Sequence, residues 1–594
     1  MFMIHLGEYR SRPPWPIGGF DVARSTSVPG RSTTRPGATS TRRSVVRTGD
    51  PDRSAAGVVS GTFVPGISPD AGGVVVDHIE SGGGPRARRR GRDRRGTGQR
   101  SALPEQRPFA QPRLLHGPTE LADADQVEAI HRASLRILGE LGMNVLDPET
   151  RSLFAEAGAA VDGTMVRFDP AMVDELIVTA PAEFTLHARR PEHDLRIGGD
   201  HLAFGSVASA PNVADLDGGR RTGNRHDFRN LLRLVQSLNS IHFTGGYPVE
   251  PVDIHGSVRH LEATLDLLTL TDKALHVYSL GRQRNRDAIE MVRIARGISE
   301  AELDEQPSLF TIINTNSPLT LDVPMSHGII EMSSRNQVVC VTPFTLAGAM
   351  APITLAGALS QQNAEALVGL MLTQIVRPGS PFVYGSFTSN VDMQSGAPAF
   401  GTPEYWRTAI IGGQLARRYR VPYRSSNTCA ANAVDAQAAY ESMFSISGAI
   451  AGGCNLLMHG AGWMEGGLHA SFEKMVIDAD LLHMVSASLD PFVVDDETLA
   501  FEAIASVGPG GHFFGTDHTQ ARFRTEFHRP MISDWRNYES WIEAGSPDAP
   551  RKANQLVKQL LADYEPPPIA DAVLSELSDF VARRTAEGGV PVDY

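Results

Sequence analysis

Eight short apolar or β-branched runs, each followed by a longer amphipathic segment, occupy the chain from residue 202 onward and constrain its fold more than any other feature. Strands that alternate with helices in this way pair in parallel through right-handed crossovers. The predicted strands are residues 203–207, 241–245, 275–280, 309–314, 337–344, 381–387, 421–427 and 455–460. The predicted helices are residues 228–238, 258–270, 287–295, 326–333, 356–375, 404–419, 435–451 and 471–488. Eight such units predict an α/β fold closed into a (β/α)8 TIM barrel over residues 201–490.

An open doubly wound sheet is the alternative reading of the same rhythm. Neither GxGxxG nor GxxxxGK[ST] follows any of the predicted strands. These glycine-rich motifs hold the phosphates in the nucleotide-binding versions of an open sheet. Their absence from the sequence therefore favours the barrel.

The parts that flank the predicted barrel differ in composition. Residues 1–108 hold 18 Arg and no Lys against 9 Asp and Glu, without sustained periodicity, and we expect a disordered leader. Clustered arginines also occur in nucleic-acid-binding arms, but no aromatic residue interleaves with them here, so no nucleic-acid partner is predicted. Residues 109–200 mix short strands with helices, the first expected between Thr119 and Gly142, and predict a small α+β cap.

Residues 491–594 predict a loop followed by a helical extension, which we expect to pack outside the barrel or at a subunit contact of a homo-oligomer. No apolar run approaches the roughly 20 residues that cross a bilayer, and no signal peptide is recognisable, so we expect a cytoplasmic protein without a membrane partner. The three cysteines, Cys340, Cys429 and Cys454, form no CxxC pair. Neither a disulfide framework nor a thiolate zinc site is therefore predicted. The spacings of His512, His518 and His528 match no known zinc pattern either, so no bound metal is expected.

Side chains just beyond the predicted strands indicate the chemistry, because barrel active sites lie at the carboxyl ends of the strands. Aromatic or neutral polar residues fill these places, among them Tyr247, Asn314, Phe344, Phe387 and Trp463. An aromatic mouth with few carboxylates and no lysine suits a quaternary ammonium ligand held by cation–π attraction. The rings could instead simply pack beneath loops. The mouth lacks the acid–base pair that a barrel lyase, isomerase or glycosidase requires.

Several longer runs resemble the trimethylamine methyltransferase family. They are APITLAGALSQQNAE at residues 351–365, VYG at 383–385, GTPE at 401–404, DAQAAYE at 435–441, and GPGGHFF at 508–514 with the HT pair at 518–519. The resemblance runs from about Thr119 to the C-terminus. It implies a barrel enzyme that passes a methyl group from an amine nitrogen to cob(I)alamin, a cofactor carried by a separate corrinoid protein.

The resemblance also narrows the substrate. Archaeal trimethylamine enzymes of the family use pyrrolysine at a strand end, which falls in or near residues 425–432 here, where only standard residues such as Cys429 occur. A quaternary nitrogen leaves as a neutral amine without help, so we expect the branch without pyrrolysine that acts on glycine betaine or a related quaternary amine. The alternatives are a trimethylamine methyltransferase-like enzyme and a quaternary-ammonium binding protein without turnover.

A betaine substrate would need a partner for its carboxylate, and the candidates are Arg424 beside the seventh strand end and His459 at the eighth. Each has a plainer explanation, as a helix-dipole or surface partner for Arg424 and as a hydrogen-bonded core histidine for His459. The glycine-rich loop at residues 508–511 is expected to fold over the mouth and bring His512 close to the substrate or the incoming corrinoid. His459 and His512 are accordingly the predicted catalytic residues.

Overall fold

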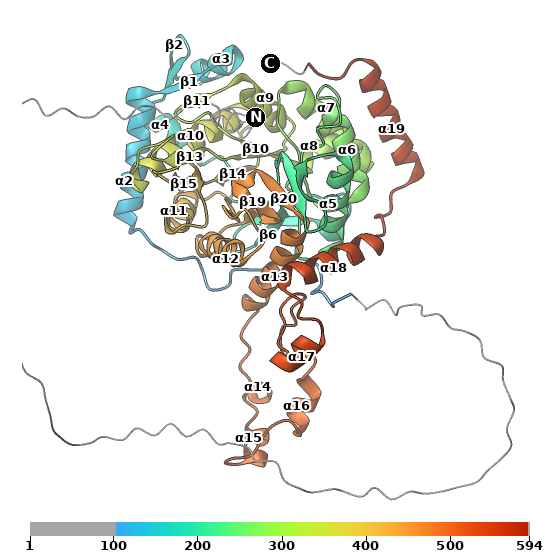
Figure 1. The fold of residues 1–594 in the computed structure, drawn as a ribbon. Coiled ribbons are helices and arrows are strands. Elements are labelled where there is room, and N and C mark those ends of the chain that lie inside the picture. Colours follow the sequence, from blue (N-terminus) through green and yellow to red (C-terminus); the bar gives the residue numbers. More distant parts are fainter. Residues whose placement is uncertain (1–102, 592–594) are drawn as a thin grey trace, which may run out of the picture. The chain divides into compact units, whose positions relative to one another are not determined.

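The computed structural model of the chain describes residues 103–591, and most of the predicted leader, residues 1–102, lies outside that range. The described residues form a mixed α/β fold in which helices surround a curled sheet of seven parallel strands (Figure 1). Among these residues, no helix combines the length and the apolar composition that crossing a bilayer requires.

The first helix, α2 (Ala124–Arg136), begins four residues later than the sequence predicts with Thr119 as its N-cap. Its cap is Asp123, whose side chain accepts the backbone N–H of Gln126 in a capping box, so Thr119 remains outside the helix. A π-helical turn continues from α2 to Gly142, which adopts a positive φ of 85° and ends the helical segment as predicted. The local capping chemistry thus decides the start of the helix, whereas the glycine decides its end.

The elements that follow α2 form a small mixed region. They are β1 (Met143–Val145), α3 (Pro148–Glu156), β2 (Ala160–Asp162), β3 (Met165–Arg167), α4 (Pro170–Ile177), β4 (Glu183–Leu186) and β5 (Leu195–Gly198). A four-stranded sheet has the order β11-β1-β3-β2, in which β11 (Thr320–Leu321) comes from a loop beyond the fourth predicted strand. This region is therefore anchored to the main sheet by chain that lies far away in the sequence.

The main sheet has the order β6-β18-β17-β14-β12-β10-β9 and every pair in it is parallel. Its strands are β6 (Ala203–Ser206), β9 (Leu275–His276), β10 (Leu309–Ile313), β12 (Val338–Val341), β14 (Phe382–Gly385), β17 (Tyr423–Ser426) and β18 (Leu456–Ala461). Each lies within or beside a predicted strand. The first and last strands in sequence, β6 and β18, are paired neighbours, so the sheet curls back on itself.

One predicted strand, residues 241–245, forms only isolated parallel bridges, from Phe243 to Gly205 on one side and to Ala274 on the other. The backbone N–H of Phe204 donates to the His242 side chain, at 2.9 Å from Nδ1. A side chain therefore occupies a place that a backbone carbonyl would take in a regular ladder. Gly205 is required here, because a Cβ at this position would lie 2.2 Å from the Phe243 ring.

A helix follows each strand, as the alternation predicts. The helices are α5 (Arg225–Ser237), α6 (Arg259–Leu270), α7 (Arg282–Arg296), α8 (Glu300–Glu305), α9 (Val323–Ser334), α10 (Leu355–Val376), α11 (Pro403–Tyr419), α12 (Ala436–Ala451) and α13 (Phe472–Ser488). Helix α11 shows why they start where they do: Thr402 accepts the N–H of Tyr405, and Pro403 occupies the first turn.

Three smaller sheets accompany the main sheet. Strands β13 (Phe344–Ala347), β15 (Phe387–Val391) and β16 (Pro398–Ala399) form one of them. Another consists of β19 (Trp463–Met464), β20 (His469–Ser471), β7 (Asn212–Asp215) and β8 (Gly219–Thr222), and β4 pairs with β5 in the third. Because β13, β15 and β19 directly follow β12, β14 and β18, they carry the predicted aromatic residues at the carboxyl ends of the main strands.

The core lies on the concave side of the main sheet. Phe243 and Phe310 meet edge to face there, with ring centroids 5.4 Å apart, and Cys340, Val383 and Met458 complete the cluster with neighbouring apolar residues. Full burial of one such side chain contributes about 1.5–3 kcal/mol to folding. The strands are thus held by packing as well as by their hydrogen bonds.

The C-terminal part consists of α14 (Asp496–Leu499), α15 (Phe501–Val507), α16 (Asp517–Arg522), α17 (Tyr538–Glu543), α18 (Ala549–Ala562) and α19 (Asp571–Ala586). Helix α18 packs against α13 and α5, and α19 packs against α6 and α7. The four short helices α14–α17 instead project away from the body of the fold (Figure 1).

Candidate active site

Five rings gather at the carboxyl ends of β12, β14 and β18. Phe387 lies 5.1 Å from Phe344 and 5.8 Å from Phe400, measured between ring centroids. Trp463 lies 5.2 Å from Phe400 and stacks on His459 at 5.0 Å. The structure therefore brings together three of the aromatic residues predicted from sequence, and we call these five rings the aromatic cluster.

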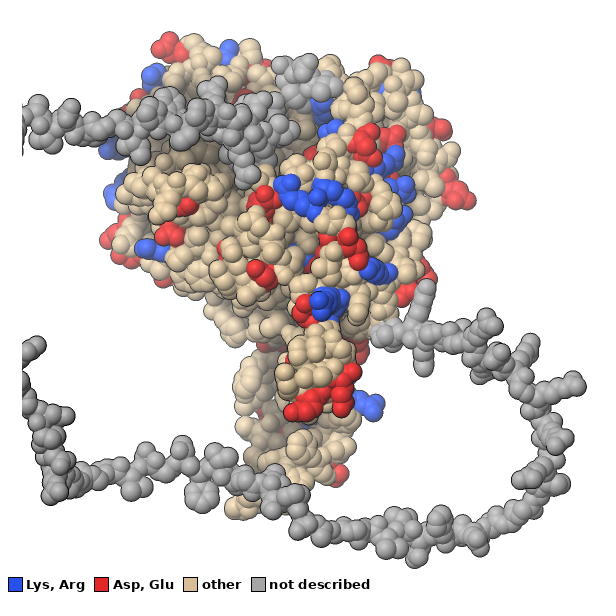
Figure 2. Space-filling model, in the orientation of Figure 1, with Lys and Arg blue, Asp and Glu red and all other residues tan. Residues whose placement is uncertain are grey.

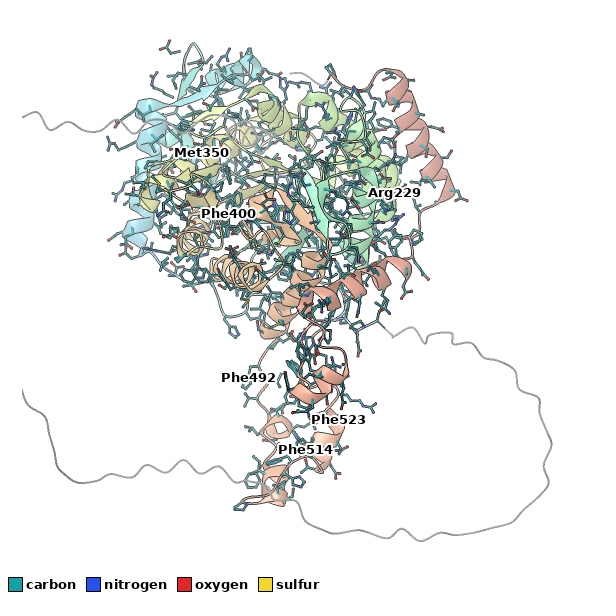
Figure 3. All side chains as sticks on the ribbon, in the orientation of Figure 1. Arg229, Met350, Phe400, Phe492, Phe514 and Phe523 are labelled. Atoms are coloured by element: carbon teal, nitrogen blue, oxygen red, sulfur yellow. The ribbon has the colours of Figure 1, made fainter. Side chains whose placement is uncertain are left out.

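Sequence reasoning missed Phe400, which is 3% exposed and lies just before α11 (Figure 3). It follows β16 rather than a strand of the main sheet, so a search confined to strand ends does not reach it. Its position directly before the GTPE run at residues 401–404 was the only available signal.

Arg424 lies beneath the aromatic cluster, with Cζ 5.2 Å from the centre of the Phe387 ring. It pairs in register with Leu456 on β18, a member of the core cluster, so both side chains are on the concave face of the sheet. Arg424 is 2% exposed. Within residues 103–591, its Nε and Nη1 atoms have no hydrogen-bond partner.

This arginine stays charged despite its burial. Desolvation lowers the pKa of Arg424 below its usual value, but a guanidinium keeps its proton in proteins. A buried cation whose donors are unpaired is costly unless an anion completes it. The site therefore offers a positive charge and unpaired N–H donors, at Nε and at Nη1, to an anionic group of a ligand.

A bulge in β18 places His459 in the cluster. The register between β18 and β6 shifts between Leu457 and Ala461, and His459 lies within the shift with a left-handed φ of 56°. Non-glycine residues seldom adopt this conformation, and bulges commonly redirect a side chain next to a functional site. The Nδ1 atom of His459 lies 3.2 Å from the Ser426 hydroxyl. Burial, followed by the charge of Arg424, holds the pKa of His459 well below its usual value, so the ring is neutral near pH 7.

A second buried histidine, His276, lies on β9. Its Nδ1 lies 2.8 Å from the Gly245 carbonyl oxygen, and its Nε2 accepts the N–H of Ile312 at 3.2 Å. These two partners assign one neutral tautomer, with the proton on Nδ1. Burial lowers the pKa of His276 to about 3, and the charge of Arg424 contributes to the shift.

Two predicted substrate-binding residues lie apart from the aromatic cluster. The Tyr247 ring packs edge to face on Tyr278 at 4.5 Å, and Tyr278 in turn lies 5.3 Å from His276. Asn314 donates from Nδ2 to the Thr342 carbonyl oxygen at 3.0 Å. None of these contacts reaches the five rings directly.

A buried carboxylate on α10 holds the loop that follows β10. Glu365 accepts hydrogen bonds from the Ser317 hydroxyl at 2.6 Å, the Leu319 N–H at 2.9 Å and the Thr315 hydroxyl at 2.5 Å. Glu365 is the last residue of the longest family-like run, and it is fully buried. Its place in the structure is that of a positioning residue, because it contacts the loop rather than the rings.

Two other helices hold the mouth loops in the same way. Glu441 on α12 accepts the N–H groups of Ala430 and Ala431, in the loop after β17. Asp478 on α13 accepts the N–H of Gly462 at 2.9 Å, directly before Trp463. Sequence reasoning missed these carboxylates because it searched strand ends, whereas they are on the helices behind the loops.

The nearby thiols are poor nucleophiles. Burial raises the pKa of Cys340 to about 11, and the pKa values of Cys429 and Cys454 to about 12. Near neutral pH all three remain protonated, and only the thiolate form is a good nucleophile. A group transferred at this site therefore needs an acceptor other than these cysteines.

The remaining predicted catalytic residue, His512, lies elsewhere. It is exposed in the connection between α15 and α16, where its ring lies 6.1 Å from that of Phe514. Figure 3 places Phe514 on the projecting helices and Phe400 in the body of the fold. Within one chain the structure does not bring His512 to the aromatic cluster, because the segment does not fold over the mouth.

One group of potential metal ligands occurs among the described residues, formed by Asp147, Glu149 and His327. Its ligand atoms lie within 4.8 Å of one another. The carboxylates already have partners, since Asp147 accepts the N–H of Thr150 at the start of α3 and Glu149 pairs with Arg282 at 2.6 Å. Capping and ion pairing explain this group without a metal.

Comparison with known proteins adds an independent line of evidence. The sequence pattern of the family described as trimethylamine methyltransferase matches residues 88–589. A glycine betaine methyltransferase from Desulfitobacterium hafniense (strain Y51) is 35% identical over 466 residues, which cover 78% of this chain and 97% of the relative. A trimethylamine methyltransferase from Desulfitobacterium hafniense (strain DSM 10664 / DCB-2) is 29% identical over 474 residues, which cover 78% of this chain and 94% of the relative.

Among solved structures, the monomethylamine methyltransferase of Methanosarcina barkeri aligns with a TM-score of 0.40 at 10% sequence identity, over 76% of this chain and 96% of that chain. Its hydroxylamine complex aligns with a TM-score of 0.41 at 11% identity, over 79% of this chain and 96% of that chain.

Proposed function

The chain belongs to the trimethylamine methyltransferase family, and from that premise we propose that it takes a methyl group from a zwitterionic quaternary amine of the glycine betaine type. The acceptor in this proposal is a corrinoid carried by a separate protein. The 35% identity to a glycine betaine methyltransferase, against 29% to a trimethylamine methyltransferase, supports this choice within the family.

The observation that carries the proposal is the buried guanidinium of Arg424 next to the aromatic cluster. A purely cationic ligand such as choline would be repelled by this charge, whereas a betaine brings its own carboxylate. One unpaired edge of the Arg424 guanidinium, at Nε or at Nη1, donates to that carboxylate in a charge-assisted hydrogen bond worth about 1.5–3 kcal/mol. The quaternary nitrogen then rests against Phe387 and its neighbours, which lie within reach of the same arginine.

The chain's own residues act by positioning. The rings hold two of the three N-methyl groups and direct the third toward the mouth, where an acceptor can approach in line. When the C–N bond breaks, its electron pair stays on nitrogen, so the amine leaves neutral and needs no proton from His459. A corrinoid would supply the nucleophile that accepts the methyl group. The protonated state of the nearby thiols is consistent with such an external acceptor.

We extend the proposal to the architecture. The bridges from Phe243 to Gly205 and to Ala274 support an eighth strand that closes the seven into a (β/α)8 barrel. The aromatic cluster would then lie at the open, carboxyl end of the barrel. We also propose a division into a cap at residues 109–200, a barrel at 201–490 and an extension at 491–594, supported by the start of β6 at Ala203 and the end of α13 at Ser488.

A direct assay tests the function. Purified protein is mixed with cob(I)alamin and, separately, with glycine betaine, proline betaine, carnitine, choline or trimethylamine. Loss of the cob(I)alamin absorbance is followed, and the demethylated amine is quantified by NMR. We expect turnover with a betaine and little with choline or trimethylamine. Faster turnover with trimethylamine would overturn the substrate class, and betaine binding without turnover would indicate a binding protein.

A further inference from the structure

A long apolar segment stands apart from the body of the fold. Residues 491–548, here called the arm, contain the short helices α14–α17. Ile532, between α16 and α17, is the one buried residue of this segment. Thirteen large apolar side chains of the arm are at least 44% exposed: Phe492, Val493, Val494, Leu499, Phe501, Ile504, Phe513, Phe514, Phe523, Phe527, Trp535, Tyr538 and Ile542. Figure 3 shows Phe492, Phe514 and Phe523 along its length. The arm therefore lacks a core of its own.

The exposed apolar area is too large for a free surface. Aromatic side chains bury about 150–250 Å² each, so the thirteen side chains leave roughly 1,000 Å² of apolar surface uncovered. The largest apolar patch of a typical monomer measures about 300–600 Å². A stable protein interface takes about 800 Å² from each partner, which the arm alone provides.

A second apolar surface lies on the outside of the body, on α12. Tyr440, Met443 and Phe444 are 61%, 45% and 37% exposed, and Phe444 stacks on Trp406 with centroids 6.0 Å apart. The one charged residue of α12 is Glu441, which is buried and occupied with the loop after β17. Surface helices usually present polar residues to water, so this face lacks its expected character.

We propose that a second copy of this chain covers the arm, and that the arm packs against the uncharged α12 face of that copy. The arm carries ten acidic residues and four arginines, so two arms would repel each other, whereas the α12 face brings no charge. Figure 2 shows the visible face of the arm as largely uncharged, with its acidic side chains gathered on one strip. In a dimer with one twofold axis, the arm of each copy packs against α12 of the other copy, so the same pair of surfaces is buried at two places.

A permanent partner fits this surface better than a transient one. Permanent interfaces are larger and more apolar than those that form and separate repeatedly. In the proposed function, a corrinoid protein leaves after each turnover and approaches the carboxyl ends of the strands rather than the outer face of α12. Residues 1–102 are rich in arginine and poor in large apolar residues, so they do not match the apolar side chains of the arm.

The test measures the mass of the full chain in solution by light scattering and sedimentation. We expect at least about twice the monomer mass of 64.1 kDa. Replacement of Phe492, Phe514 and Phe527 by Asp should reduce the mass to that of one chain, and so should Tyr440→Glu with Phe444→Glu. Val178→Asp is the matched control, since Val178 is 78% exposed but lies outside both surfaces and should leave the mass unchanged.

Hydrogen exchange provides a readout that does not depend on the variants. Helices of six or seven residues such as α15 and α16 are unstable alone, so they exchange freely in a monomer and slowly when a partner covers them. Monomeric wild-type protein, or arm variants that keep the wild-type mass, would overturn the proposal. Unchanged mass in the α12 variants alone would refute α12 as the docking face. If oligomers form only after residues 1–102 are removed, those residues, and not a second copy, cover the arm in the full chain. Methyl transfer is not measured, so either proposal can fail without the other.

Discussion

Replacement of Arg424 by Met should change stability, betaine binding and choline binding in different directions. The free energy of unfolding of the ligand-free protein should rise, because Met removes a buried charge whose Nε and Nη1 atoms have no partner among the described residues. Apolar replacement of buried ionic groups stabilises proteins by about 1–4 kcal/mol. Met is also flexible enough to fill the space of the arginine stem. A chemical denaturation series measures this change.

Binding of glycine betaine should weaken in the same variant. Loss of one hydrogen bond to a charged group costs about 1.5–3 kcal/mol, which raises Kd roughly 10- to 150-fold. Choline has the same ammonium group but no carboxylate. Two unit charges 6 Å apart repel by about 3 kcal/mol at an effective dielectric constant of 20, so choline should bind at least about 10-fold more tightly to Arg424→Met.

Isothermal titration calorimetry measures the affinities of wild-type and Arg424→Met protein for glycine betaine and for choline. Arg418→Met is the control, because Arg418 lies on α11 with its side chain 28% exposed and pairs with Glu128, away from the rings. Both affinities should be unchanged in the control. If Arg424→Met weakens betaine and choline equally, the guanidinium does not recognise a carboxylate, and the choice of a zwitterionic substrate is wrong.

Three other predictions test the surroundings of Arg424. Leu in place of Phe387 or Trp463 should weaken betaine binding about 5- to 30-fold, since a cation–π contact is worth about 1–2 kcal/mol. The affinity for 3,3-dimethylbutyrate, in which a carbon replaces the quaternary nitrogen, should change far less. Equal losses for both ligands would show that cation–π attraction does not contribute to binding. Glu365→Gln should reduce kcat/KM and lower the free energy of unfolding by about 1–3 kcal/mol, because the loop after β10 loses a charged acceptor. If Glu365→Asp keeps both kcat/KM and stability at the wild-type level, the role of Glu365 is purely electrostatic. Burial lowers the pKa values of His242 and His276 to about 3, so the unfolded chain binds protons more readily than the folded one. The free energy of unfolding contributed by these rings should be fully present above about pH 6.5 and fall progressively toward pH 4, by up to about 1.4 kcal/mol per pH unit for each histidine. A urea-unfolding series without this slope would contradict the burial of both rings.

Local patterns predicted most of the regular structure. Runs of alternating or β-branched residues identified seven strands of the main sheet, and apolar residues at helical spacing identified the helices between them. These signals work because each depends on neighbours within one element, where side-chain period and burial are coupled directly. Helix α11, predicted at residues 404–419 and found at Pro403–Tyr419, illustrates how closely capping residues mark such a boundary. The family resemblance was also readable from short runs and is confirmed by the match over residues 88–589.

The candidate site was only partly accessible to the same reasoning. Phe344, Phe387 and Trp463 follow strand ends, so their meeting could be expected from the barrel rhythm. Phe400 joins them from a hairpin that the rhythm does not describe. The bulge that redirects His459 was equally invisible, because it depends on register between β18 and β6 rather than on either sequence alone.

The tertiary structure alone decided which groups lack partners and where distant segments lie. Arg424 could have been a surface arginine in an ion pair, and its isolation under Phe387 emerges only when strands far apart in the sequence are side by side. For His512 the outcome was the opposite. Its glycine-rich loop suggested a lid over the site, but the structure places the loop on the arm. Periodicity and caps are properties of a few consecutive residues, whereas burial, pairing and register are set by contacts between elements, which one sequence does not specify.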